Sequence, residues 1–181
     1  MASFFVSRVD TAVDTLLAQR IDDRSETKIN EVGNTLSHML GTVAVANAKL
    51  AYRAFEESFS SERFMVLKSK GAHVQRPLWA STGTKNPSYS DNLYVDSLIG
   101  EDTVNTMPEA TLRSFLDHGI PDQTVKNDFE GAQRTIDTLL KLGIDLGEIT
   151  DTLLFEGVKA FADSYDQLID EINDKIVNLR N

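Results

Sequence analysis

Three short apolar segments, separated by long helical patterns, place the strongest constraint on the fold of this chain. Interpreted as strands, they lie near residues 2–7, 78–81 and 103–106. Short apolar strands that alternate with helices form βαβ units, whose strands are parallel and covered by helices. The sequence therefore predicts a helix-rich α/β fold with three parallel strands.

Helical periodicity accounts for most of the remaining sequence. Apolar residues at helical spacing predict helices at about Val9–Leu17, Ile29–Phe59, Asn127–Leu142 and Thr152–Val177, the last two making up a C-terminal helical region over 127–178. The run Thr106-Met-Pro-Glu109 has the pattern of a capping box with proline in the first turn, and Gly119 is a stop signal. We therefore expect a further helix between these two signals.

Three strands are few for a stable parallel sheet, which must be covered on both faces and protected at its edges. The chain has 181 residues, of which 41% are hydrophobic, enough for the core of one domain. A complete (β/α)₈ barrel, however, takes about 250 residues. The simplest expectation is that residues 1–181 form part of a single larger sheet or barrel domain.

Charge and composition argue against several classes of protein. The formal net charge is −10 and the basic residues are scattered, which disfavours nucleic acid and anionic membrane surfaces as partners. There is no cysteine, no apolar run of membrane-spanning length and no signal-peptide pattern. His38, His73 and His118 lack metal-ligand spacing, so we expect no metal. These features predict a cytoplasmic protein.

The first strand is followed by a cation, Arg8, at the point where parallel sheets build their sites. The planar guanidinium group suits a phosphate or a carboxylate. An alternative is that Arg8 forms an ion pair with Asp10 or Asp14 at the start of a helix. Ser3 and Phe5 lie on the same side of this strand and could project inward.

The second strand ends in a polar loop, Ser81-Thr-Gly-Thr-Lys-Asn86, which is followed by a turn and a short helix closed by Gly100. Hydroxyl groups, a glycine and the cation Lys85 give this loop the composition of an anion site, although it lacks the G-x-x-x-x-G-K-[ST] pattern of nucleotide-binding loops. Two cations at the carboxyl ends of two strands predict one oxyanion site.

Five runs in the sequence carry a resemblance to a known family: Gln75–Pro87, Ala2–Thr11, Ala44–Tyr52, Asp102–Pro108 and Glu156–Asp163. Together they strongly resemble the transaldolases. The resemblance implies the C-terminal part of a (β/α)₈ TIM barrel, with the three segments as its strands six to eight. It implies a transferase of carbohydrate metabolism that needs no metal or cofactor.

Such enzymes move a dihydroxyacetone unit between sugar phosphates through a lysine Schiff base, in the pentose phosphate pathway. The resemblance implies reaction of sedoheptulose 7-phosphate with glyceraldehyde 3-phosphate to give fructose 6-phosphate and erythrose 4-phosphate. It assigns Arg8 and Ser81 to the substrate phosphate, and Ser3 and Phe5 to the substrate pocket. Lys85 falls near a second phosphate-binding cation, which is an arginine in a shorter loop in many relatives.

The family's Schiff-base lysine and acid/base residues belong to strands one to five, outside these 181 residues. We therefore expect no catalytic residue here and an inactive isolated chain, which would need the missing N-terminal barrel half or self-association. Whether it is a truncated piece, a gene fragment or half of a split enzyme stays open. Two alternatives are a non-catalytic sugar-phosphate-binding protein and a helical scaffold protein.

Overall fold

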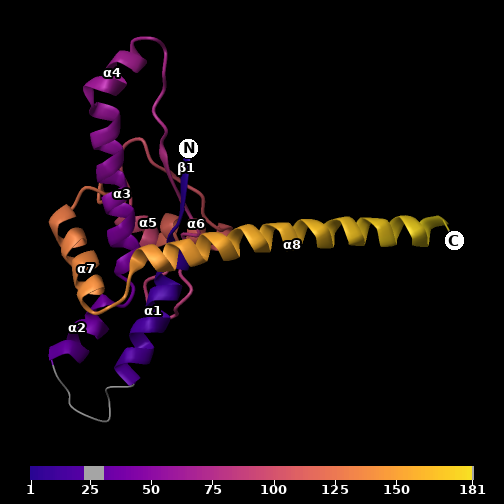
Figure 1. Ribbon diagram of the computed structural model, residues 1–181, viewed down its shortest axis with the longest axis horizontal. Helices are drawn as coiled ribbons and strands as arrows, with labels where there is room; N and C mark the ends of the chain where they lie inside the picture. The colour runs from indigo at the N-terminus through magenta and orange to yellow at the C-terminus, as the bar shows by residue number, and fades with distance from the viewer. Residues whose placement is uncertain (23–30, 181) are drawn as a thin grey trace. The chain divides into compact units, whose positions relative to one another are not determined.

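The structure is a computed structural model that describes residues 1–22 and 31–180. The chain divides into two compact units, one ending at Leu146 and one starting at Gly147. The first contains, in order, β1 Ala2–Phe5, α1 Val6–Asp22, α2 Glu31–Met39, α3 Val43–Ser60, α4 Glu62–Lys68, β2 Pro77–Ala80, α5 Leu93–Ser97, β3 Val104–Asn105, α6 Glu109–His118 and α7 Phe129–Lys141 (Figure 1). The second holds all but the first residue of the long helix α8, Leu146–Arg180.

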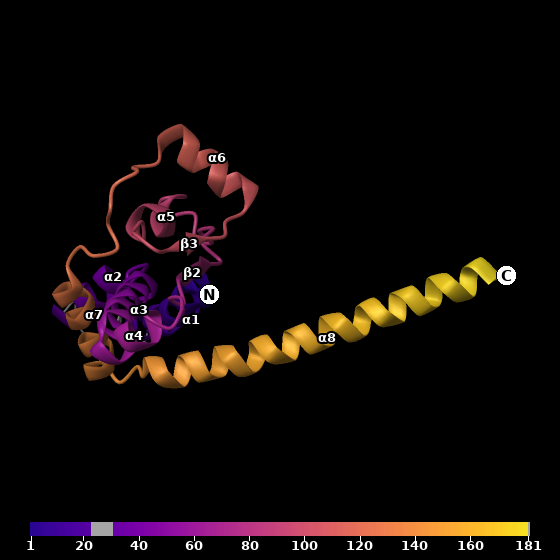
Figure 2. The same cartoon turned by 90° about the horizontal axis from the view of Figure 1, so that it is seen from above.

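The sheet has the order β1-β2-β3, and both strand pairs are parallel. Ala2 is paired with Pro77, and Leu78 with Val104. Figure 2 shows β2 and β3 next to each other, with α5 close to them. The prediction of three parallel strands in a helix-rich α/β fold is confirmed. The expected boundary at residue 7 was wrong, because helix α1 already begins at Val6.

One face of the sheet is buried and the other is open. Trp79 is fully buried, its ring centroid lies 5.6 Å from that of Phe4, and its indole Nε1 donates a hydrogen bond to the Leu98 carbonyl at 3.0 Å. On the opposite face of β1, Ser3 and Phe5 are exposed. Because side chains alternate along a strand, this burial pattern defines one covered face and one uncovered face.

The single helix expected over Ile29–Phe59 is instead two helices, α2 and α3; residues 29 and 30 lie outside the described residues. The chain turns at Gly41, whose φ of +72° suits glycine. Two carboxylates of α1 satisfy backbone groups at this turn. Asp14 Oδ1 accepts the Gly41 N–H at 3.1 Å, and Asp10 Oδ1 accepts the Ala44 N–H at 2.7 Å. Apolar residues continue at helical spacing through this turn, so the sequence pattern did not indicate a break between two helices.

The predicted capping box before α6 was also wrong. The Thr106 hydroxyl donates to the Trp79 carbonyl at 3.4 Å, and the Thr106 N–H donates to the same carbonyl at 2.9 Å. Thr106 thus extends the strand pairing, and α6 begins only at Glu109, after an extended Pro108. The helix ends at His118, directly before Gly119, as expected.

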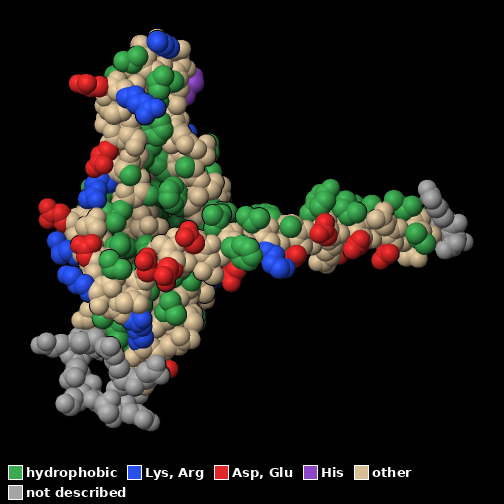
Figure 3. All heavy atoms as spheres, viewed as in Figure 1, with side chains coloured by type: hydrophobic (Ala, Val, Ile, Leu, Met, Phe, Trp, Pro, Cys, Tyr) green, Lys and Arg blue, Asp and Glu red, His purple; other side chains and the backbone are tan. Residues whose placement is uncertain are grey.

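The C-terminal helical region also differs at its boundaries. Helix α7 starts at Phe129 because Asp128, with φ +56°, caps it and accepts the Gly131 N–H at 2.8 Å. Helix α8 begins before the expected Thr152 and is 35 residues long. Taken by itself, α8 bears an exposed apolar stripe along its length, visible as green side chains in Figure 3. No helix in the described part of the chain has the length and hydropathy needed to cross a membrane.

Candidate functional site

The carboxyl ends of β1 and β2 are joined by a backbone hydrogen bond. The Ser7 N–H donates to the Ser81 carbonyl at 3.1 Å, directly beyond the pairing of Phe5 with Ala80. Arg8 follows Ser7 in the first turn of α1. The structure therefore brings Arg8 and Ser81, predicted from separate segments, to the same edge of the sheet.

The Arg8 side chain is exposed and packs over an aromatic ring. Its guanidinium carbon lies 4.8 Å from the centroid of the Phe5 ring, a cation–π contact. The alternative pairing of Arg8 with Asp10 or Asp14 was wrong, since both carboxylates bind backbone groups at the Gly41 turn. Within residues 1–22 and 31–180, Arg8 makes no ion pair. Its donors face solvent and can receive an anion.

Ser81 follows β2 in a left-handed conformation with φ of +55°, which is uncommon for a residue other than glycine. The next residue, Thr82, is fully buried, and its hydroxyl donates to Asn105 Oδ1 at 2.7 Å. This bond ties the end of β2 to the end of β3. The Ser81 backbone is therefore held between the ends of both neighbouring strands.

Lys85 lies further along the same loop and is exposed. Among the described residues it forms no ion pair. The loop around it is closed by the Thr84 hydroxyl, which donates to the Ser90 carbonyl at 2.9 Å. Lys85 thus follows the carboxyl end of β2, in a segment held by side-chain contacts and not by regular structure.

Comparison with known proteins identifies the family. Residues 1–172 match the family described as Transaldolase/Fructose-6-phosphate aldolase. The chain belongs to this family. Its members are TIM barrels, and this chain is a partial piece of such a barrel. The name transaldolase denotes a transferase, so the chain belongs to a transferase family.

Relatives named transaldolase support the assignment. One from Mycolicibacterium smegmatis is 48% identical over 172 residues, which cover 94% of this chain and 43% of the relative. One from Acidothermus cellulolyticus is 47% identical over 93% of this chain and 42% of the relative. One from a Parafrankia species is 44% identical over 97% of this chain and 45% of the relative. The chain thus spans less than half the length of these transaldolases.

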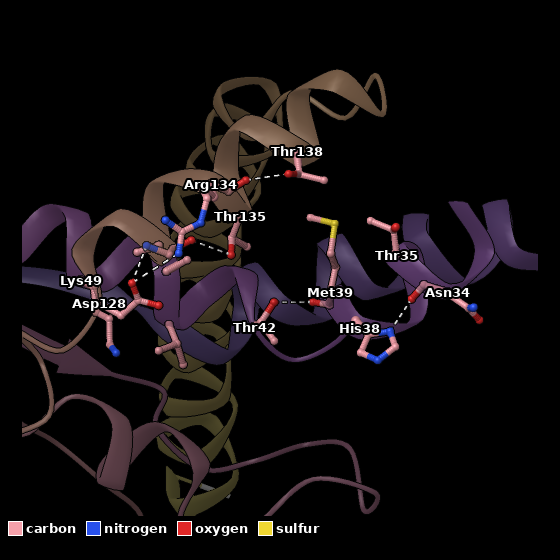
Figure 4. Close-up of a pocket in the computed structure, with 14 residues that line it drawn as sticks. Asn34, Thr35, His38, Met39, Thr42, Lys49, Asp128, Arg134, Thr135 and Thr138 are labelled. Atoms are coloured by element: carbon pink, nitrogen blue, oxygen red, sulfur yellow. Dashed lines mark hydrogen bonds and ion pairs between the residues drawn. The ribbon is translucent and has the colours of Figure 1, made fainter. Parts of the chain in front are cut away.

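The chain also has a groove of about 610 Å³ between α2, α3 and α7, away from the ends of the strands. Figure 4 shows His38 towards one end and Lys49, Asp128 and Arg134 towards the other. Lys49 Nζ donates to the Asn127 carbonyl at 2.9 Å, and Arg134 Nη2 lies 3.6 Å from Asp128 Oδ1. The groove contains none of the predicted site residues, and its charged groups already have partners. We do not assign it to the candidate site.

Two features next to the candidate site were not recognised from the sequence. Asp10 is buried, and burial raises the pKa of its carboxyl group to about 6, although the Ala44 N–H and the Tyr94 hydroxyl partly oppose the shift. The Tyr89 hydroxyl donates to Asp14 Oδ2 at 2.8 Å. Four-residue spacing of Asp10 and Asp14 on an apolar helix face was the available signal for a carboxylate pair, of which Asp10 is buried and Asp14 partly buried.

Proposed function

We propose that this chain supplies the phosphate-binding side of a transaldolase active site. The enzyme would transfer a dihydroxyacetone unit between sugar phosphates of the pentose phosphate pathway. The observation that carries the proposal is the exposed side chain of Arg8 near Ser81, at the joined ends of β1 and β2, with no ion-pair partner among the described residues. Family membership gives that anion site its substrate class.

In this proposal Arg8 binds the substrate phosphate with two parallel N–H donors, and the Ser81 hydroxyl and Lys85 add further donors. The Phe5 ring lies beneath the guanidinium group and limits its orientations. Ser3 and Phe5, on the open face of the sheet, line the substrate pocket. β1, β2 and β3 would then be strands six to eight of the barrel.

A Schiff-base lysine must be desolvated to lower its pKa, and it needs an acid or base beside it. Lys85 is exposed and does not fit this role. Burial lowers the pKa of Lys49, but this residue lines the groove beside α7. The chain is therefore proposed to be inactive alone. Its partner would be the missing N-terminal barrel half, in the cytoplasm, or in its absence a second copy of the chain.

Borohydride trapping tests this proposal. The purified chain, incubated with fructose 6-phosphate and borohydride, should keep its mass, because no lysine forms the imine that borohydride reduces. Adding a polypeptide with the remaining barrel strands should restore trapping on that polypeptide. A specific adduct on Lys85 of the isolated chain would contradict the proposal. Phosphate binding with no trapping in any combination would favour a sugar-phosphate-binding protein.

Arg8→Ala tests the phosphate role in the complemented enzyme. Loss of a charge-assisted bidentate contact should cost about 2–5 kcal/mol of transition-state binding for phosphorylated substrates. Unphosphorylated acceptors should be affected far less. The measurement is kcat/KM for matched acceptors with and without the phosphate group. Equal losses for both acceptors would remove Arg8 from the phosphate site.

A further inference from the structure

Lys85 lies in a segment that contains no helix or strand, residues 81–92. Its position therefore depends on the side-chain contacts of that segment. Two cations bind one phosphate group well only when their spacing is already fixed, because ordering a loop on binding reduces the affinity. The contacts that hold this loop therefore bear on the site.

Tyr89 provides a contact at both ends of its side chain. Its hydroxyl donates to Asp14 Oδ2 at 2.8 Å. Burial and the Asp14 carboxylate raise the pKa of this hydroxyl, so it stays a donor. Its ring lies against the Gly41 turn, where an added Cβ atom would be 2.9 Å from the ring carbon Cε2. Tyr89 is thus fixed both by its hydroxyl group and by its ring.

The position of Tyr89 determines that of the loop around Lys85. The Tyr89 N–H donates to the Asn86 carbonyl at 3.1 Å, which closes a turn directly after Lys85. On the other side of Lys85, the Thr84 hydroxyl donates to the Ser90 carbonyl at 2.9 Å. The residues on either side of Lys85 are therefore each hydrogen-bonded, one to Tyr89 and the other to the next residue, Ser90.

Asp14, which receives the Tyr89 hydroxyl, lies on the helix that carries Arg8. The other carboxylate oxygen of Asp14 accepts the Gly41 N–H at 3.1 Å, so the carboxylate itself is held in place. A helix is rigid over two turns, so the hydrogen bond from Tyr89 to Asp14 connects the loop that contains Lys85 to α1, the helix that carries Arg8.

We propose that Tyr89 is a positioning residue that sets the spacing between Arg8 and Lys85, and with it the affinity for a phosphate group. This inference rests on the proposed function of the same site. Since Tyr89 would act through Lys85, its contribution must vanish when the Lys85 side chain is removed. A residue that only stabilises the fold would contribute in either background.

The test measures the Kd of inorganic phosphate for the 181-residue chain, from the NMR shifts of the Gly83 amide and its neighbours. Tyr89→Phe keeps the ring over Gly41 and removes the hydroxyl. It should weaken phosphate binding about three- to ten-fold, the range expected for one hydrogen bond. Tyr89→Phe combined with Lys85→Ala should bind no more weakly than Lys85→Ala alone. Tyr165→Phe, on α8, is the matched control and should change nothing.

An equal loss in both backgrounds, or no loss in either, would overturn the positioning role of Tyr89. Arg8→Ala separates this result from a failure of the proposed function. If Arg8→Ala weakens phosphate binding and Tyr89→Phe does not, only the inference about Tyr89 fails. If Arg8→Ala leaves the Kd unchanged, the proposed phosphate site fails. An unmodified chain that shows no saturable binding contradicts both.

Discussion

The carboxyl group of Asp10 is buried while its neighbours on α1 include a second carboxylate. Burial is the main cause of its raised pKa, and Asp14 adds repulsion. The folded chain therefore holds this proton more tightly than the unfolded chain does. The stabilisation is complete below the ordinary pKa of 3.8 and is lost as the pH rises towards about 6.

Asp10→Asn should remove this pH dependence. The variant keeps the oxygen that accepts the Ala44 N–H but no longer ionises. Relative to the unmodified chain, its free energy of unfolding should rise between pH 4 and pH 6, by up to about 3 kcal/mol for a shift of two pKa units. Urea unfolding followed by the fluorescence of Trp79 measures the difference. Parallel pH profiles for the two proteins would contradict a raised pKa of Asp10.

At the residue scale, the sequence predicts what lies at a strand end and misses what depends on distant packing. Arg8 and Ser81 were placed correctly at one edge because parallel strands end together. The contacts of Tyr89 could not be recognised in the sequence. Its hydrogen-bond partner Asp14 and the turn at Gly41, against which its ring lies, are both far away along the chain. The roles of Ser3, Phe5 and Lys85 in binding stay predictions.

At the level of elements, the turn between α2 and α3 determines how α3 meets α1. Gly41 has φ of +72°, and a Cβ atom there would meet the Tyr89 ring. Gly71 has φ of +93° after α4, with no atom within 4 Å of an added Cβ. The two glycines share a left-handed backbone and differ in their surroundings.

Gly41→Ala and Gly71→Ala form a matched pair. Both should lose about 1–2 kcal/mol of stability through the left-handed backbone conformation. Gly41→Ala should lose more than this, because the new methyl group displaces Tyr89 from the turn. Urea unfolding of both variants measures the difference. Equal losses of stability in the two variants would show that the Tyr89 ring moves away from the new methyl group without any loss of stability.

The elements with strong signals were predicted well, and those decided by tertiary contacts were not. Gly119 ends α6 by a local signal, whereas Thr106 forms a strand contact with Trp79 that local spacing cannot show. The break at Gly41 was missed because apolar residues continue at helical spacing on both sides of it. A glycine inside a helical pattern is a weak signal without knowledge of its φ angle.

At the scale of the whole molecule, each of the two units, taken by itself, has apolar surface that it does not cover. Among the described residues, β1 and β3 each pair only with β2, which leaves two strand edges open. Phe5 on the open sheet face is 41% exposed. Taken by itself, α8 carries Phe161 in an apolar stripe along its length. Open strand edges and apolar surface of this kind promote association.

The isolated chain should therefore self-associate, as sedimentation would show by a rising average mass with concentration. Phe161→Glu places a charge in the apolar stripe and should lower the average mass. Ala160→Glu adds the same charge on the polar side of α8 and should have little effect. A stable monomer at high concentration, with no binding of an apolar dye, would contradict this expectation.

The register of the sheet has a consequence for the order in which the chain folds. Pairing Ala2 with Pro77 closes a much longer chain loop than pairing Leu78 with Val104 does. The longer loop costs roughly 1 kcal/mol more in closure entropy. The β2–β3 unit should therefore form first and serve as the template on which β1 adds late. The edge that carries Arg8 would then be the last part of the site to assemble.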